Sequence, residues 1–267
     1  MITAAGRRLF LGFVTVFLTA PLVVVAGVSL NARKQLVFPP QGLSGRWYVE
    51  LVTSREWLIP VRNSLVIASS SALLALSVAL PLAYFLWRYR VFYAQALRAL
   101  GIAPFILPPV ITALGFLVFW AATPLFGGQI TVVVSHGIFF TTLPLVTISL
   151  GLESISADVI EAAETLGANE RTVFRTVVLP LVLPYVISGY AFAFVLSLNE
   201  YIVAYMVAGF TVETLPIKIF NSLRYGYTPV MAAVTVVFVL LAGVIFGVIA
   251  RHGDLPRLLG AWMPERG

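Results

Sequence analysis

Residues 161–184 read EAAETLGANERTVFRTVVLPLVLP, a polar stretch in a chain that is otherwise strongly apolar. The chain is 60% hydrophobic and only 10% charged, and its mean hydropathy is +0.99. A water-soluble domain of this size needs far more polar surface, whereas a chain surrounded by lipid does not. The composition therefore predicts an all-α polytopic membrane protein. Residues 161–184 are a place where a water-soluble partner can reach it.

The composition also excludes several kinds of site. The chain has no cysteine, which rules out disulfides and thiolate metal sites. Its two histidines are too few for a histidine-based metal site, so no metal site is predicted. A net charge of +6 in such a chain is typical of loops that meet anionic membrane lipid, not of nucleic-acid binding. No linker or low-complexity tract divides residues 1–267, so we expect a single transmembrane domain.

Six apolar stretches are long enough to cross the hydrocarbon core as helices, which takes about 20 residues each. They lie near residues 9–30, 63–87, 99–121, 130–152, 183–208 and 229–250. The third and fourth come from Ala99–Leu152, which has no charged residue and is interrupted at Thr123-Pro124 and at Gly127-Gly128-Gln129. The first stretch is too long for a signal peptide and no clear cleavage site follows, so we expect a retained helix. Six spans place both termini on one side of the membrane.

The polar segment 153–182 contains an apolar pattern with the period of a helix. Val159, Ala162, Ala163 and Leu166 fall at i, i+3, i+4 and i+7, which places them on one helix face. A surface hairpin without a partner is one interpretation of this segment. That interpretation does not explain why two alanines stand among larger residues. Small side chains there favour the close approach of another surface.

Capping residues mark the ends of this predicted helix. Ser156 suits an N-cap, and Gly167 can adopt the left-handed conformation that ends a helix. Asn169 can then cap a second short helix, with Glu170 in its first turn. The segment is therefore predicted to form a helix, a tight turn and a second helix in water.

The same segment resembles the EAA loop of ABC importer permeases, whose pattern is Glu-Ala-Ala, three residues, Gly, nine residues and Ile-x-Leu-Pro. The matching residues are Glu161, Ala162, Ala163, Gly167, Leu179 and Pro180, with Val177 in place of the isoleucine. The resemblance implies a type I ABC importer permease fold and a cytoplasmic coupling helix that sits in a groove of an ATP-binding subunit. The residues that it places at this contact are Glu161, Ala162, Ala163, Leu166 and Gly167. It also implies a bacterial inner-membrane location, with the N- and C-termini in the cytoplasm.

The chain contains no recognisable nucleotide-binding or catalytic motif. A phosphate-binding P-loop needs Gly-x-x-x-x-Gly-Lys-Ser/Thr, but the only lysines are Lys34 and Lys218, preceded by Arg33 and Ile217. Gly-x-Ser-x-Gly, His-Glu-x-x-His and Cys-x-x-Cys are also missing. We therefore expect no enzymatic activity and no cofactor in this chain. ATP and Mg are expected in the partner ATPase.

Glu200 is the one acid in the predicted span 183–208. An acid at the centre of a membrane helix costs about 2.5–3.5 kcal/mol, so it usually faces a cavity or a partner. Ser197 and Tyr201 can share its face and Asn199 lies beside it, which makes these four residues the candidate substrate pathway. The alternative is a structural glutamate paired with a basic group. His136 in the fourth span is open to two interpretations, a hydrogen-bonded packing group or a substrate contact.

A wider resemblance involves the spermidine/putrescine (PotC-like) permease group. The segments that look like this group are Thr214–Phe220, Tyr227–Ala233 and Ser197-Leu198-x-Glu200 ahead of Val207-Ala208-Gly209. The resemblance implies a heterodimer with a second related permease, two copies of an ATP-binding subunit and an external solute-binding protein. It also implies transport of a polyamine or a related organic amine.

This chain departs from that group at two places. Permeases of the group often have paired acids in span five and another acid early in span three. Here Asn199 stands first in the pair, and Leu107-Pro108-Pro109-Val110 has no acid. An importer of an amino-acid-like, opine-like or anionic solute is therefore an alternative. Two further alternatives are an ATP-independent secondary transporter or channel, and an intramembrane enzyme.

Overall fold

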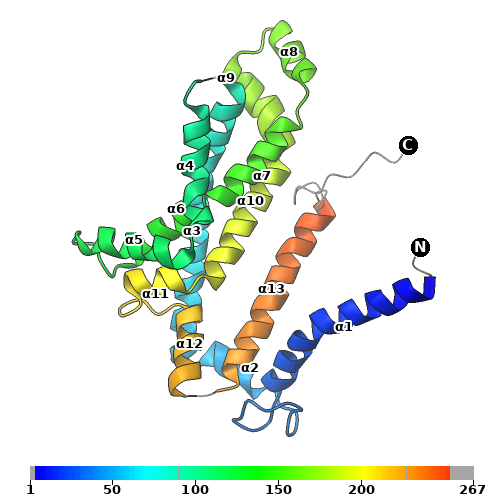
Figure 1. Cartoon of the computed structure of the whole chain (residues 1–267), viewed down its shortest axis with the longest axis vertical. Helices are drawn as coiled ribbons and strands as arrows, with labels where there is room; N and C mark the ends of the chain where they lie inside the picture. The colour runs from blue at the N-terminus through cyan, green and yellow to red at the C-terminus, as the bar shows by residue number, and fades with distance from the viewer. Residues whose placement is uncertain (1–3, 90, 227, 253–267) are drawn as a thin grey trace. The chain divides into compact units, whose positions relative to one another are not determined.

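The computed structural model describes residues 4–89, 91–226 and 228–252 (Figure 1). Tyr227 lies outside the described residues, and so do the two ends of the chain, which we expect in the cytoplasm. In chain order the elements are α1 (Ala4–Ser29), α2 (Arg46–Thr53), α3 (Arg55–Arg88), α4 (Ala94–Ile106), α5 (Pro109–Ala121), α6 (Gln129–Phe140), α7 (Thr142–Glu153), α8 (Ala157–Thr165), α9 (Glu170–Val173), the π-helix η1 (Phe174–Val178), α10 (Leu179–Asn199), α11 (Ile202–Ala208), α12 (Leu215–Tyr225) and α13 (Val230–His252).

The secondary structure of the described residues is helical, and every helix is an α-helix except the π-helix η1. In the described residues the sole β-type pairing is an isolated bridge between Asn31 and Leu43. Within the part of the chain that the structure describes, five helical segments are long and apolar enough to cross a membrane, and the bent pair α4–α5 gives a sixth if it is one span. The prediction of an all-α polytopic membrane protein is therefore confirmed.

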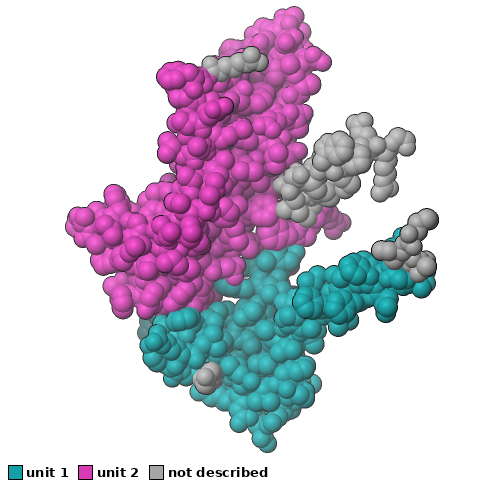
Figure 2. Space-filling view, viewed as in Figure 1, with its two compact units in different colours: residues 1–60, 218–243 teal, residues 61–217, 244–267 magenta. Residues whose placement is uncertain are grey.

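The chain divides into two compact units, coloured separately in Figure 2. Unit 1 comprises residues 1–60 and 218–243, and unit 2 comprises residues 61–217 and 244–267. In unit 1 the loop after α1 closes around the buried side chain of Asn31. Its Oδ1 accepts hydrogen bonds from the backbone N–H groups of Arg33 and Gln41, both at 3.1 Å. The indole of Trp47 donates to the Asn31 carbonyl at 2.6 Å.

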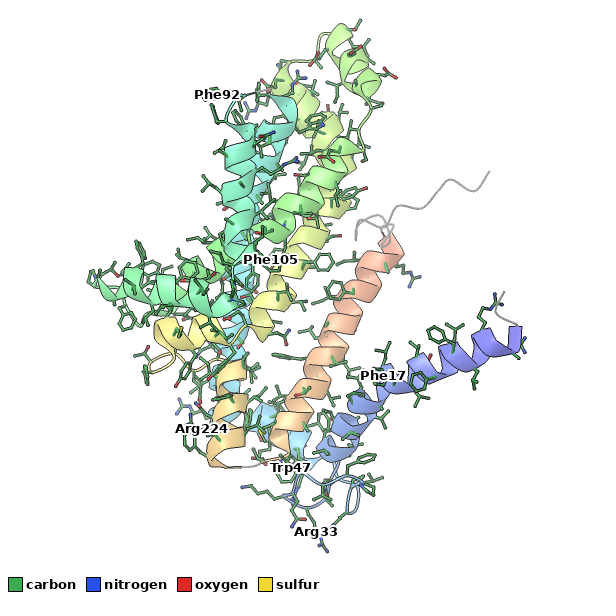
Figure 3. All side chains as sticks on the ribbon, in the orientation of Figure 1. Phe17, Arg33, Trp47, Phe92, Phe105 and Arg224 are labelled. Atoms are coloured by element: carbon green, nitrogen blue, oxygen red, sulfur yellow. The ribbon has the colours of Figure 1, made fainter. Side chains whose placement is uncertain are left out.

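Helix α1 presents apolar side chains all around its surface. Leu9, Leu11 and Phe17 lie on different sides of the helix and are 78%, 55% and 67% exposed, and Phe17 is labelled in Figure 3. Such a surface is unfavourable in water but not in lipid or against another membrane helix. The exposure of α1 therefore agrees with its prediction as a membrane span.

Unit 2 is built on close packing between helices that carry small residues. Along α3, five alanines recur at three- and four-residue spacing, each with at most 1% exposure: Ala68, Ala72, Ala75, Ala79 and Ala83. Helix α10 packs against α7, and Gly189 of α10 lies directly over Pro144 and Thr147 of α7. Small residues at such contacts let membrane helices approach closely.

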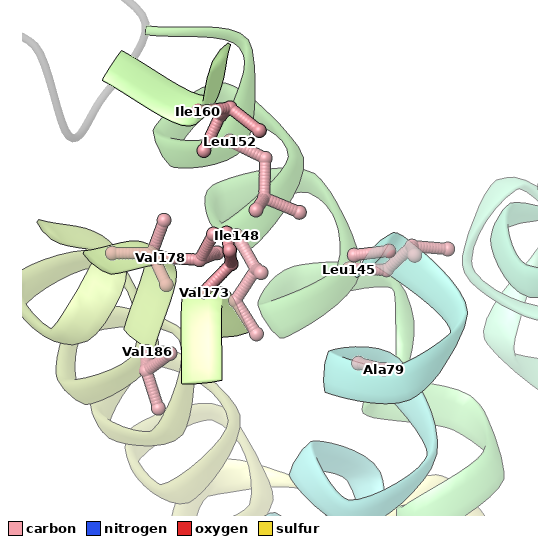
Figure 4. Packing of buried hydrophobic residues seen from close by; sticks show 10 residues of the cluster. Ala79, Leu145, Ile148, Leu152, Ile160, Val173, Val178 and Val186 are labelled. Atoms are coloured by element: carbon pink, nitrogen blue, oxygen red, sulfur yellow. The ribbon is translucent and has the colours of Figure 1, made fainter. Parts of the chain in front are cut away.

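A cluster of buried aliphatic side chains fills the end of unit 2 that lies next to α8 (Figure 4). Its members come from α3, α7, α8, α9, η1 and α10: Ala79, Ala83, Leu145, Ile148, Leu152, Ile160, Val173, Val178, Val182 and Val186. Ile160 is the residue that α8 contributes. The cluster therefore joins the polar loop to the membrane helices.

The segment 99–121, expected as one span, forms two helices that meet at 103°. Leu107 and Pro108 both have extended backbone, with ψ of 145° and 132°. Each of these residues precedes a proline, and the proline ring disfavours the helical conformation of the residue before it. Helix α4 therefore ends at Ile106, and α5 starts with Pro109, a favoured first helical residue.

Candidate functional site

The polar loop has its helix ends at the predicted residues. Ser156 occupies the N-cap position of α8, although its side chain makes no capping hydrogen bond, and Gly167 has a φ of +85°. The N–H of Gly167 donates to the Glu164 carbonyl at 2.9 Å, and the N–H of Ala168 donates to the Ala163 carbonyl at 3.1 Å. This pair of bonds is a Schellman motif, which satisfies carbonyls at the end of a helix.

The start of α9 is also as predicted. The side chain of Asn169 accepts a hydrogen bond from the backbone N–H of Thr172 at 2.9 Å. The first helix and the turn are therefore confirmed, but the second helix is not a separate short one: α9 continues through η1 into α10, so a single helical segment runs from Glu170 to Asn199.

Helix α8 has three sides: one that faces the core, one that forms an exposed apolar strip and one that is polar. Ile160 is 6% exposed and Ala163 is half-buried against the same core. Leu166 is 88% exposed and Val159 is 43% exposed, and with the exposed Ala162 they form an apolar strip. We call Val159, Ala162 and Leu166 the α8 strip. Of the predicted contact residues, the structure thus turns Ala163 toward the protein's own core.

The polar side of α8 is exposed as well. Asp158, Glu161 and Thr165 lie there, and the carboxylates of Asp158 and Glu161 form no hydrogen bond or ion pair within the described residues. Glu164 differs, because its Oε1 lies 2.5 Å from Nη2 of Arg88 at the end of α3.

Tyr89 holds the second helix of the loop. Its hydroxyl donates a hydrogen bond to Glu170 in the first turn of α9. That bond to a carboxylate raises the pKa of the Tyr89 phenol above its ordinary value, because the neutral phenol is the donor.

The helix expected over 183–208 is interrupted at the candidate substrate residues. Helix α10 ends at Asn199, Glu200 has an extended ψ of 126°, and α11 begins at Ile202. The Glu200 carboxylate caps the new helix: its Oε1 accepts from the N–H of Val203 at 2.9 Å, and its Oε2 accepts from the N–H of Ala204 at 3.0 Å. Glu200 therefore stabilises the break through the first backbone donors of α11.

His136 on α6 joins both sides of this break. Its Nε2 lies 3.0 Å from Oε2 of Glu200, and its Nδ1 lies 2.8 Å from the hydroxyl oxygen of Ser197 on α10. An ionised carboxylate can only accept, so Nε2 is the donor to Glu200. In the neutral imidazole Nδ1 accepts from Ser197, whose hydroxyl can rotate to suit. The structure thus supports the hydrogen-bonded packing role of His136.

The four predicted pathway residues do not act as one cluster. Ser197 and Glu200 both contact the imidazole of His136. The side chain of His136 is 1% exposed and that of Glu200 is 8% exposed. Asn199 is exposed, and its amide donates to the Val195 carbonyl at 2.8 Å. Tyr201 is half-buried and stacks on Tyr205, with ring centroids 5.3 Å apart.

Sequence reasoning did not find the connection between His136 and Glu200. The two residues are 64 positions apart, and no local pattern links them. Next to His136, Ser135 accepts a hydrogen bond from the indole of Trp120 on α5 at 2.8 Å. Across residues 4–89, 91–226 and 228–252, no group of three or more His, Asp or Glu side chains is placed to hold a metal ion.

These features define a class: a multi-pass membrane protein that has broken apolar helices and a polar loop in which two capped helices are joined by a tight turn. Residues 72–254 match the family described as the binding-protein-dependent transport system inner membrane component. The chain belongs to this family and is an ABC importer permease subunit of the bacterial inner membrane. The predicted family is thereby confirmed.

Individual relatives agree with this assignment. The putrescine transport system permease protein PotI of Escherichia coli (strain K12) is 35% identical over 244 residues, which cover 89% of this chain and 86% of PotI. The spermidine/putrescine transport system permease protein PotC of Haemophilus influenzae is 29% identical over 236 residues, which cover 88% of this chain and 91% of PotC. A bacterial ABC transporter that imports the acidic polysaccharide alginate shares the fold, with a TM-score of 0.69 at 15% identity, over 94% of this chain and 98% of that one.

Proposed function

We propose that this permease subunit carries a polyamine or a related organic amine. The observation that supports this most is the 35% identity, over most of both chains, to a putrescine permease. Putrescine and spermidine are short alkyl chains with several ammonium groups, so a pathway for them has to accept positive charge. The acid Glu200 stands beside the exposed Asn199 at the α10–α11 break.

The α10–α11 break borders the substrate pathway in this proposal. Asn199 and Tyr201 are more accessible than the side chains behind them and would meet the solute. Glu200 and Ser197 lie deeper and hold the backbone of the break with His136. The carboxylate also supplies a negative charge near the pathway, and its attraction for an ammonium group is stronger in a partly dry site than in bulk water.

The proposed importer contains three further kinds of subunit: a second related permease, two copies of an ATP-binding subunit and an external solute-binding protein. ATP and Mg bind to the ATP-binding subunits. The α8 strip docks on one of them, which places the α8 loop and both termini in the cytoplasm. Two observations support this docking: the apolar strip is exposed on a loop helix, and the loop residues have the spacing of the EAA pattern.

Uptake measurements test the proposed substrate. Cells that express the complete importer are expected to accumulate labelled putrescine, and excess unlabelled putrescine or spermidine is expected to compete. Depletion of ATP is expected to stop uptake, whereas collapse of ion gradients at constant ATP is expected to leave the rate of uptake unchanged. Competition by an amino acid or an anionic solute, with none by amines, would contradict the substrate. Uptake that follows the ion gradient would contradict the ABC mechanism.

A further inference from the structure

Helix α8 has few contacts that fix its direction. It has nine residues, and Ile160 is its one buried side chain. A helix this short is marginal in water by itself. Ile160 and the half-buried Ala163 anchor only one side of α8, which leaves the helix free to tilt about that side. The direction of α8 therefore depends on its polar contacts with neighbouring helices.

Arg88 and Glu164 make the contact that ties α8 to α3, with 2.5 Å between Nη2 and Oε1. Arg88 is the last residue of α3, and Glu164 lies in the last turn of α8. A cation is favourable at the C-terminal end of a helix, and an acid is unfavourable there. The position of Glu164 thus disfavours α8 by itself, and the nearby guanidinium of Arg88 compensates for it.

The neighbouring residues of α3 hold the other side of the loop. Tyr89 donates its hydrogen bond to Glu170 on α9. Tyr84, about one turn earlier on α3, packs edge-on against Phe174, with ring centroids 4.8 Å apart. The end of α3 therefore contacts the helices on both sides of the turn at Gly167.

The Arg88–Glu164 pair is too exposed to account for much of the folding stability. The two side chains are 33% and 41% exposed, and ion pairs of this kind contribute little to stability because water screens them. The pair instead joins the last turn of α8, which carries the α8 strip, to the end of α3. Helix α3 has 34 residues and is about 51 Å long, so it reaches from this loop through the membrane.

We propose that Arg88 and Glu164 are positioning residues, which transmit a movement of α8 to α3. When the ATP-binding subunit moves the α8 strip, the ion pair makes the end of α3 follow. This inference rests on the proposed docking of α8. Without the pair, α8 would still dock and ATP would still be hydrolysed, but α8 would tilt about its core-facing side, Ile160 and Ala163, and the transmembrane helices would follow it poorly.

The test compares charge variants of the assembled importer in proteoliposomes. The variants are Arg88→Glu, Glu164→Arg and the two together. The matched control is Arg98→Glu, which breaks the exposed 3.4 Å pair between Arg98 of α4 and Glu153 of α7 without touching α8. Solute uptake and ATP hydrolysis are measured on the same samples, together with the amount of ATP-binding subunit that copurifies.

Each single variant at Arg88 or Glu164 is expected to lower uptake per ATP hydrolysed by about tenfold, a typical size for coupling between sites. The double variant is expected to recover most of that loss, and Arg98→Glu is expected to keep the wild-type ratio. A wild-type ratio in Arg88→Glu, or a double variant no better than the single ones, would overturn the inference. Failure of the ATP-binding subunit to copurify with the wild-type chain would instead overturn the docking on which it rests.

Discussion

Replacing Glu200 with alanine is expected to lower the thermal midpoint of the subunit and to abolish uptake. The carboxylate accepts hydrogen bonds from His136 and from the first turn of α11, and it is 8% exposed. Its removal leaves the buried N–H donors of His136, Val203 and Ala204 without their acceptor, which costs about 1–3 kcal/mol for each donor. In a chain of this size that loss corresponds to a fall in Tm of roughly 10 °C.

The control for this prediction is Glu153→Ala, which removes an acid that is 56% exposed and is expected to change Tm little. His136→Ala should resemble Glu200→Ala, and the double variant should be little worse than either, since the two residues act as a unit. A Glu200→Ala subunit with unchanged Tm but no uptake would contradict the capping role. That result would mean that the carboxylate serves the solute instead of the helix break.

Replacing Gly189 with valine is expected to prevent α10 from packing on α7. A β-carbon at this position would lie 2.6 Å from the Cα of Pro144 and 2.6 Å from the hydroxyl oxygen of Thr147. A backbone atom cannot move aside as a side chain does, so the helices must separate. Overpacking of a well-packed core typically costs about 1–3 kcal/mol, and a backbone clash costs more.

The same substitution at Gly115 on α5 is the matched control, because a β-carbon there meets no atom within 4 Å. The amount of monodisperse protein on size-exclusion chromatography and its Tm measure the effect. Gly189→Val is expected to reduce both strongly, and Gly115→Val is expected to leave both near the wild-type values. Equal behaviour of the two variants would show that the α7–α10 contact does not need a glycine.

The polar loop was predictable because its structure follows from local chemistry. Gly167 can adopt a positive φ, and Asn169 offers a side-chain oxygen to the N–H groups that follow it, so both caps were predicted from neighbouring residues. The division of the α8 surface was less predictable. Spacing alone placed Ala163 with Val159 and Leu166, but the burial of Ile160 turns Ala163 toward the core.

The two helix breaks were missed for different reasons. Hydropathy measures whether a stretch can lie in a membrane, not whether it is one straight helix. At Leu107 the two following prolines disfavour the helical conformation of the residues before them, an effect that hydropathy does not include. At Glu200 the carboxylate caps α11 locally, but His136 and the packing of α11 on α5 and α6 also stabilise the break, and these contacts come from elsewhere in the chain. Such long-range contacts are visible only in the folded protein.

Photo-cross-linking from α8 tests the central claim, that the α8 strip docks on an ATP-binding subunit. The chain has no cysteine, so Leu166→Cys introduces a unique thiol that can carry a benzophenone label. Phe210→Cys is the control, because Phe210 is also highly exposed, at 91% against 88% for Leu166, and lies outside α8. In the assembled importer, the label at position 166 is expected to form an adduct with the ATP-binding subunit, and the label at position 210 is expected to form none. No adduct from position 166, or equal adducts from both positions, would contradict the account.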